Sequence, residues 1–308
     1  MRLRLALTAM LPLLSLAACG TSAASQEAGP TRTVKHAMGE TKVPMTPRRV
    51  VVLDSDKLDS MVSLGLAPVG AVQASDNQTW PEYLGSALSG LKSVGTIAQP
   101  NLEAISALKP DLILGSKFRQ AAYYDKLSKI APTVFTERVG ITWKENFLLD
   151  AEALGKKDQG RQLLTAYETR AKQVGAKFAK LKVSIVRFRP TEIRIYGPDG
   201  FSGIVLGDAG IPRPQAQLLE GKDDRRFAKL SQENLSDADG DALFYSAFGD
   251  EAAKSQAEVT AGPLWQNLDA VKAGHAFKVD DEIWMTGIGV TAAGKILDDL
   301  DKYLTPLV

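Results

Sequence analysis

The segment from Asp158 to Leu181, DQGRQLLTAYETRAKQVGAKFAKL, decides how the rest of the chain is interpreted. Its apolar residues recur at steps of three and four, the period of one helix face. They are Leu163, Tyr167, Ala171, Val174, Phe178 and Leu181. A helix of this length would span about 36 Å, roughly the width of a small domain. Because strand and helix patterns alternate on both sides of it, we expect this helix to join two α/β lobes. The alternative is a surface helix of a single α/β domain.

The composition excludes one broad class of partner. The 308 residues are 44% hydrophobic and 24% charged, which suffices for one large core or two modest ones. The formal net charge is +1. Loss of the first eighteen residues, which carry two arginines and no acid, would make it −1. Nucleic-acid binding requires a basic face, so this balance argues against a nucleic-acid partner.

The N-terminus has the pattern of a secretory signal. Arg2 and Arg4 precede an apolar run from Leu5 to Leu16, which is too short to span a membrane. We therefore expect residues 1–18 to be a signal peptide. The following Leu-Ala-Ala-Cys resembles a bacterial lipobox, which implies that Cys19 is lipidated. A plain signal peptide is the alternative. Cys19 is the only cysteine, so no disulfide can form within the chain.

The segment after Cys19 is small and polar. Residues 19–33 are expected to form a lipid-anchored flexible tether, which would hold the protein at the extracytoplasmic face of the cell membrane. The N-terminal lobe is then expected over 34–157, the connecting helix over 158–181 and the C-terminal lobe over 182–308. Alternating strands and helices in both lobes indicate mostly parallel sheets covered on both faces.

The pattern within the lobes can be followed residue by residue. Extended runs are expected at 49–55, 68–73, 93–97, 111–116, 132–137, 183–190, 192–196, 242–247 and 276–279. Helical patterns are expected at 57–66, 101–109, 120–130, 143–154, 201–210, around Asn234, and at 250–260, 263–273 and 290–304. An internal echo supports two lobes, because EAISALKPDLILGS from Glu103 aligns with ENLSDADGDALFYS from Glu233 without a gap.

The chain resembles the ABC-transporter substrate-binding lipoproteins for ferric siderophores, haem and cobalamin. The resemblance runs from Arg49 almost to the C-terminus. Its main stretches are RVVVLDSDKLDSMVSLGLAPVG (49–70), PNLEAISALKPDLILGS (100–116), IAPTV (130–134), WKENFLLDAEALGK (143–156) and GPLWQNLDAVKAGHAFKVDDEIWMTGIGVTAAGKILDDL (262–300). VRFRPTEIRIYGPDGFSGIVLGDAGIPRP (186–214) looks most like the iron-siderophore branch, with ferrioxamine or hydroxamate receptors as the model.

The resemblance implies a fold and a function. The fold would be that of class III periplasmic binding proteins, with two Rossmann-like lobes joined by one long backbone helix. The protein would be a monomeric receptor that binds a ferric siderophore, of the hydroxamate type such as a ferrioxamine, in the cleft between the lobes. It would deliver this ligand to an ABC importer permease and so serve iron transport and iron homeostasis. No intrinsic cofactor and no enzyme activity are implied.

The residue types agree with a ligand that brings its own metal donors. A bare Zn²⁺ or iron site ordinarily needs a cluster of His, Cys or carboxylate ligands. This chain has only His36 and His275, and Cys19 is assigned to the lipid. A ferric siderophore already wraps its iron in oxygen atoms. The protein then needs aromatic walls and a few cationic or hydrogen-bonding groups, and no protein metal ligand.

Two neighbouring strand patterns supply such groups. Arg187 and Arg189 are two residues apart and share one face of a strand. Arg194 and Tyr196 share a face of the next strand in the same way. On a hairpin beside the cleft, these four side chains would form a cationic wall for hydroxamate or carboxylate oxygens. The alternative is a solvated sheet face with ordinary arginines.

Other candidates for the cleft follow from position in the resembling fold. Arg119 comes just after an expected strand, and ligands bind at the carboxyl ends of strands in open α/β sheets. The aromatic candidates for the cleft wall are Trp80, Trp143, Trp284 and Phe201. Each of these is equally compatible with core packing, whereas Trp265 is interpreted as packing.

Glu103 and Glu233 have a separate role in the resembling family. They match the two glutamates, one on each lobe, that dock onto arginines of the permease. One exposed carboxylate on each lobe would set orientation and encounter rate. Both also favour helix N-termini through the helix dipole, and the two interpretations are compatible.

Alternative functions remain open at this point. A haem or cobalamin receptor of the same fold is the first, although His275 follows a helix end and is a poor axial ligand. A secreted α/β enzyme is remote, because the sequence has no nucleophile elbow or P-loop. A structural surface lipoprotein is a third class. The sequence also leaves hydroxamate, catecholate and mixed-carboxylate ligands undecided. A single connecting helix predicts only modest closure of the lobes on binding.

Overall fold

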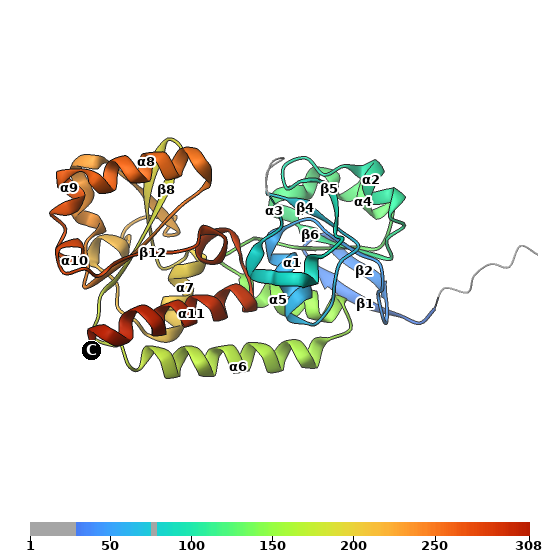
Figure 1. Cartoon of the computed structure of the whole chain (residues 1–308). Coiled ribbons are helices and arrows are strands. Elements are labelled where there is room, and N and C mark those ends of the chain that lie inside the picture. The colour runs from blue at the N-terminus through green and yellow to red at the C-terminus, as the bar shows by residue number, and fades with distance from the viewer. Residues whose placement is uncertain (1–28, 75–78) are drawn as a thin grey trace, which may run out of the picture.

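The computed structural model describes residues 29–74 and 79–308. In these residues the strands form two five-stranded sheets and one separate hairpin, and each large sheet lies in its own lobe (Figure 1). The long helix α6 (Lys157–Gly175) runs beneath both lobes. The expected class, two α/β lobes joined by one backbone helix, is therefore confirmed. No helix in the described ranges is both long and apolar enough to cross a membrane.

The N-terminal sheet is fully parallel. In spatial order its strands are β5 (Lys92–Thr96), β4 (Gly70–Gln73), β3 (Val50–Val52), β6 (Leu112–Ser116) and β7 (Thr133–Thr136). The helical segments of this lobe are α1 (Ser55–Ser63), η1 (Glu82–Leu88), α2 (Leu102–Ala107), α3 (Lys117–Gln120), η2 (Ala121–Tyr123), α4 (Tyr124–Ser128) and α5 (Trp143–Ala153). The inner strands β3 and β6 are fully buried and rich in Val, Ile and Leu, as expected for a sheet covered on both faces, whereas the edge strand β5 is largely exposed.

The C-terminal sheet is mixed. Its spatial order is β10 (Phe227–Leu230), β9 (Glu192–Tyr196), β8 (Val183–Arg189), β11 (Ala242–Ala247) and β12 (Ala276–Lys278). β9 is antiparallel to both of its neighbours, and the other pairings are parallel. The helical segments are α7 (Phe201–Ala209), η3 (Gln215–Gln217), η4 (Gln232–Ala238), α8 (Gly249–Ala261), α9 (Pro263–Gln266), α10 (Asp269–Lys272), the π-helical turn η5 (Glu282–Thr286), α11 (Val290–Leu304) and η6 (Thr305–Leu307).

The internal echo corresponds to equivalent places in the two sheets. β6 lies between β3 and β7, and β11 lies between β8 and β12. Glu103 lies in the first turn of α2 before β6, and Glu233 lies in the first turn of η4 before β11. The echo therefore reflects a repeated helix-and-strand unit in the two lobes.

The connecting helix is shorter than expected. It ends at Gly175 instead of Leu181, and at this glycine it packs closely against the end of α7. A Cβ atom at Gly175 would lie only 1.7 Å from the carbonyl oxygen of Ala209. Phe178, beyond the helix end, is still fully buried. The spacing of apolar residues therefore predicted the burial of Phe178 correctly, although this residue lies beyond the end of the helix.

One hairpin was not expected. β1 (Thr31–His36) pairs with β2 (Gly39–Pro44), so the proposed tether cannot extend to residue 33. Arg32 holds this hairpin against the N-terminal lobe by donating to the carbonyl of Ala153 (2.8 Å), at the C-terminal end of α5. The signal peptide 1–18 and Cys19 lie outside the described residues.

One apolar core continues from lobe to lobe. Its buried residues include those of α5, α6, α7 and α11, and α6 contacts each of the other three helices. Figure 1 shows α11 lying along α6. On α6 the buried side chains are Leu164, Tyr167, Ala171 and Val174, which are spaced as one helix face.

A second connection between the lobes is polar. Asp59 of α1 is buried, and its carboxylate accepts the backbone N–H groups of Thr291 and Ala292 at the start of α11, both at 3.0 Å. Tyr83 also donates to it, at 3.1 Å. A side chain at Gly289 would collide with Asp59, since a Cβ atom there would lie 2.3 Å from Oδ1. A residue of the N-terminal lobe therefore caps a helix of the C-terminal lobe.

Candidate ligand-binding cleft

A cavity of about 210 Å³ lies between the lobes. The N-terminal lobe contributes Phe118 and the loop that contains Arg138, Val139 and Ile141. The C-terminal lobe contributes Asp199 and the run Asp223-Asp224-Arg225-Arg226, just before β10. Phe118 is 62% exposed, so it is a large aromatic surface at the cavity that is free to contact a ligand.

The β8–β9 hairpin has the geometry expected from its sequence. Arg187 is directly opposite Arg194, so the two lie on the same face of the sheet. Val186, Phe188, Ile193 and Ile195 fill the opposite face and are 0–6% exposed. The predicted separation of a polar face from an apolar face is therefore confirmed.

Arg187 itself is not open to solvent. Only 5% of it is exposed, and its guanidinium forms a two-point ion pair with Asp281 (Nε–Oδ1 2.8 Å, Nη2–Oδ2 2.6 Å). Its third nitrogen, Nη1, donates to the hydroxyl of Tyr196 at 3.2 Å. Ser246 of β11 also donates to Asp281, at 2.9 Å. The prediction that Arg187 lines the cleft as an open cation is therefore wrong for this structure.

The other two arginines of the hairpin differ from each other. Arg194 is paired with Glu192 and lies over the ring of Phe227, with its guanidinium carbon 3.9 Å from the ring centre. Arg189 lies 4.5 Å from the ring centre of Phe248 and is only partly exposed. Burial, followed by the charges of Arg187 and Arg194, lowers the pKa of Arg189. Among the described residues, no carboxylate approaches Arg189 within ion-pair distance.

Of the three arginines that line the cavity, two are paired with carboxylates and one is not. Arg225 is paired with Asp199 at 3.0 Å, and Arg226 with Asp224 at 2.7 Å. Hydrogen bonds from Arg226 lower the pKa of Asp224 to about 2. Arg138 has no ion pair within the described part of the chain. Arg138 thus lines the cavity without an ion pair, although its charge also helps to lower the pKa of Asp224. Arg189 is the unpaired arginine of the β8–β9 hairpin and is not among the residues that line this cavity.

Arg119 lies where the sequence places it. It belongs to α3, directly after β6, and its Nε lies 2.9 Å from Asp54, which directly follows β3 and Leu53. About a third of the Arg119 side chain is exposed (34%). It therefore stands at the carboxyl ends of two neighbouring parallel strands, although Asp54 balances its charge.

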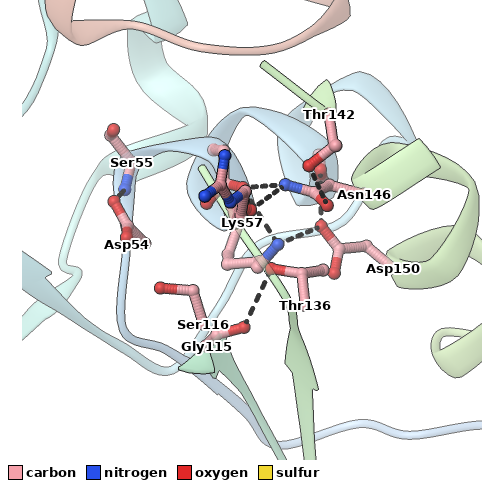
Figure 2. A network of polar contacts seen from close by, with 12 residues as sticks. Asp54, Ser55, Lys57, Gly115, Ser116, Thr136, Thr142, Asn146 and Asp150 are labelled. Atoms are coloured by element: carbon pink, nitrogen blue, oxygen red, sulfur yellow. Dashed lines mark hydrogen bonds and ion pairs between the residues drawn. The ribbon is translucent and has the colours of Figure 1, made fainter. Parts of the chain in front are cut away.

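A buried polar network lies behind Arg119. Lys57 is fully buried and forms ion pairs with Asp56 (3.0 Å) and Asp150 (3.3 Å). Figure 2 shows Lys57 pointing toward Asp150, with Asn146 nearby. Burial, opposed by Lys57, raises the pKa of Asp150 to about 7. Burial and the charge of Asp56 raise the pKa of Asp54 to about 6.

These pKa values predict an unusual pH dependence of stability. The folded carboxyl groups bind protons more tightly than in the unfolded chain, so their contribution is fully present below about pH 4 and is lost as the pH rises through 6 and 7. We expect the free energy of unfolding, measured in urea, to fall by about 4 kcal/mol between pH 5 and pH 8. Asp150→Asn should remove about two-thirds of this fall, whereas Asp158→Asn, at an exposed residue, should preserve it. A stability that rises over this range would contradict the assignment.

Most of the aromatic candidates are core residues. Trp284 is fully buried, stacks on Phe244 (4.7 Å between ring centres) and donates to Asp299 at 2.8 Å. Trp143 and Phe201 are 2% and 5% exposed and pack edge to face against each other across the lobes. These three are therefore corrected from wall to core, because long-range packing covers them. Trp265 is buried, as expected.

Trp80 is the aromatic candidate that stays at the junction of the lobes. It is half-buried and lines a small cavity of about 40 Å³ together with Ser55 and Pro81 from its own lobe. Glu282 and Thr286 line the same cavity from the other lobe. Trp80 therefore remains a candidate for ligand contact.

Both docking candidates are exposed. Glu103 lies in the first turn of α2, and Glu233 lies in the first turn of η4. Neither carboxylate has an ion pair within residues 29–74 and 79–308. Each is therefore free to meet a cation on a partner surface.

Several residues that line the cavity or contact the arginines of the β8–β9 hairpin were not predicted from the sequence. These are Phe118, Arg138, Asp199, Asp223, Asp224, Arg225, Arg226, Phe248 and Asp281. The run Asp223 to Arg226 alternates its charges only once and reads as an exposed turn. Asp281 is 94 residues from Arg187, so no local pattern links them. Within the described ranges, no group of three or more His, Cys, Asp or Glu is arranged to hold a metal ion.

Comparison with known proteins agrees with this architecture. A family model described as periplasmic binding protein matches residues 50–283. The chain belongs to this family. As a periplasmic binding protein it is part of a family of transport receptors, in agreement with the expectation of a receptor rather than an enzyme.

Relatives of this periplasmic binding protein cover nearly its whole length. The Bacillus subtilis "Probable siderophore-binding lipoprotein YfiY" is 40% identical over 309 residues, covering 96% of this chain and 95% of the relative. The "Fe(3+)-citrate-binding protein YfmC" of the same species is 30% identical over 304 residues, covering 95% and 94%. The crystal structure of Staphylococcus aureus SirA complexed with staphyloferrin B matches with a TM-score of 0.78 and 37% identity, covering 89% of this chain and 99% of SirA.

Proposed function

We propose that this periplasmic binding protein captures a ferric siderophore between its lobes and delivers it to an ABC importer permease. The observation that carries the proposal is the cavity between the lobes, which Arg138 lines without an ion pair among the described residues, together with the unpaired Arg189 on the β8–β9 hairpin of the other lobe. Such cations bind the negatively polarised oxygens on the surface of a ferric chelate, with Phe118 as an adjoining aromatic surface. The iron would be held by the siderophore, so the chain needs no intrinsic cofactor.

The proposal also specifies the class of ligand and the location of the receptor. Hydroxamate chelates such as ferrioxamine are our first expectation, and citrate-type chelates are the competing class suggested by the relatives. Lipidation at Cys19 would keep the monomeric receptor at the extracytoplasmic face of the cell membrane. Because α6 and the Asp59 cap both connect the lobes, we expect only modest closure on binding.

A titration of the purified protein tests the receptor function. Ferrioxamine, ferric citrate, a ferric tris-catecholate, haem and cobalamin would each be added while the intrinsic fluorescence is recorded. We expect saturable binding of a ferric siderophore, weakened at least about tenfold, or about 1.4 kcal/mol, by Arg189→Glu. Arg161→Glu makes the same charge change on the exposed side of α6 and serves as the matched control. Binding of haem or cobalamin alone would replace the siderophore assignment.

Docking through the two glutamates makes a separate prediction. In cells that depend on this receptor, the double variant Glu103→Arg and Glu233→Arg should reduce iron uptake about tenfold, because both contacts with permease cations become repulsive. Ligand affinity of the purified double variant should stay unchanged. Glu251→Arg, at an exposed carboxylate in the first turn of α8, is the control. Unchanged uptake in the double variant would exclude these residues from docking.

A further inference from the structure

The ion pair of Arg187 with Asp281 divides the arginines of the hairpin into two kinds. Arg187 is 5% exposed, and all three of its guanidinium nitrogens have a partner. Asp281 matches its charge and is itself held by a hydrogen bond from Ser246. Arg189, two residues further along β8, lies on the same Phe248 ring as Arg187 but has no carboxylate partner among the described residues. Glu192 pairs with both Arg194 and the exposed Lys229 of β10, which lies opposite Arg194, so this face of the sheet presents two positive charges more than its carboxylates match.

The same pair also fixes the hydroxyl group of Tyr196. Arg187 donates to this oxygen at 3.2 Å, so the oxygen acts as an acceptor in that contact. A tyrosine hydroxyl has one proton of its own, which must then point away from Arg187. Tyr196 is only partly buried, and within the described residues no acceptor takes this proton. The hydroxyl can therefore donate to an oxygen atom of a molecule in the cleft.

We propose that Asp281 sets the charge preference of the cleft by neutralising Arg187, and that Arg187 positions Tyr196 as a hydrogen-bond donor to the ligand. This inference rests on the proposed receptor function. Arg187 is then a positioning residue, and Arg189 and Tyr196 contact the chelate. The favoured ligand class is a ferric chelate of low net charge with exposed hydroxamate or carboxylate oxygens. A strongly anionic tris-catecholate would need more unmatched cations than the two that remain on this face while Asp281 neutralises Arg187.

The test compares chelates of different charge. Affinities of the wild type and Asp281→Asn are measured by calorimetry for cationic ferrioxamine, anionic ferric citrate and a more anionic ferric tris-catecholate, at low and high salt. Asn keeps the size of Asp but leaves Arg187 unmatched. We expect the affinity for the tris-catecholate relative to ferrioxamine to rise about fivefold or more, with a steeper salt dependence. Asp280→Asn removes an exposed carboxylate one residue away and should shift this ratio less.

Tyr196→Phe tests the second half of the inference. It removes the hydroxyl and keeps the ring, so affinity for the bound chelate should fall about three- to tenfold at low and high salt alike. If Asp281→Asn lowers affinity for all chelates by the same factor, Asp281 is merely structural and the inference is overturned while the receptor function stands. An unchanged affinity of Tyr196→Phe overturns the positioning of the hydroxyl. A wild type that binds no chelate overturns the receptor function and this inference together.

Discussion

Lys57→Met is expected to lower the free energy of unfolding by about 3–5 kcal/mol at pH 7. Lys57 is fully buried between Asp56 and Asp150, and Asp54 belongs to the same group of carboxyl groups. Removal of the ammonium group leaves these carboxylates uncompensated in a site that water does not reach. Breaking a buried ion pair from one side is costly because the remaining charge stays buried.

The pH distinguishes this electrostatic loss from a packing defect. Each carboxyl group that gains a proton becomes neutral, so the loss caused by Lys57→Met should shrink as the pH falls from 8 to 5. Urea unfolding at both pH values measures the difference, and Asp150→Asn in the same chain should restore part of the stability at pH 8. Lys92→Met, at an exposed lysine, should change stability by less than about 0.5 kcal/mol. A loss from Lys57→Met that is equal at both pH values would indicate packing alone.

Asp59→Ala is expected to lower the free energy of unfolding by about 3 kcal/mol and to loosen the junction of the lobes. The substitution leaves the N–H groups of Thr291 and Ala292 without their acceptor in a buried place. The start of α11 would then lose its cap from the other lobe. Hydrogen exchange measured by NMR should become faster at these two amides, and urea unfolding should give the change in stability.

Asp59→Asn is the matched control for this cap. It retains one carbonyl oxygen as an acceptor, so its loss of stability should be smaller than that of Asp59→Ala. Because burial already raises the pKa of Asp59, the neutral side chain also avoids a desolvation penalty. If exchange at Thr291 and Ala292 were the same in Asp59→Ala and in the wild type, the cap would not control this end of α11.

The fold was largely accessible from the sequence because its signals are local. The period of α6, the buried Val and Ile strands and the two-residue alternation of the hairpin each lie within one element, and the structure has all three. The end of α6 was misjudged, because the apolar spacing continues to Phe178, which is fully buried although it lies beyond the helix end. The β1–β2 hairpin was missed because its residues look like an unstructured polar segment.

The cleft was less accessible because exposure depends on distant residues. A tryptophan in the sequence indicates a large apolar side chain, but it does not show whether other parts of the folded chain cover that side chain. Trp284 is buried by Phe244, which comes from a strand 40 residues earlier in the sequence. Arg187 loses its open charge to Asp281 in the same way. The sequence predicted residue types that suit a ferric chelate, whereas which of these side chains are exposed could be seen only in the structure.

The apolar core that continues from α5 through α6 and α7 to α11 has a consequence for how the protein is made. Trp143 and Phe147 are synthesised well before Ile296 and Leu300, which help to close the same core. The first lobe therefore stays incomplete, with apolar surface exposed, until the last helix has been synthesised. Such surface is prone to aggregation. The two lobes are thus expected to finish folding together, as one cooperative unit, and neither half is expected to be soluble when produced alone.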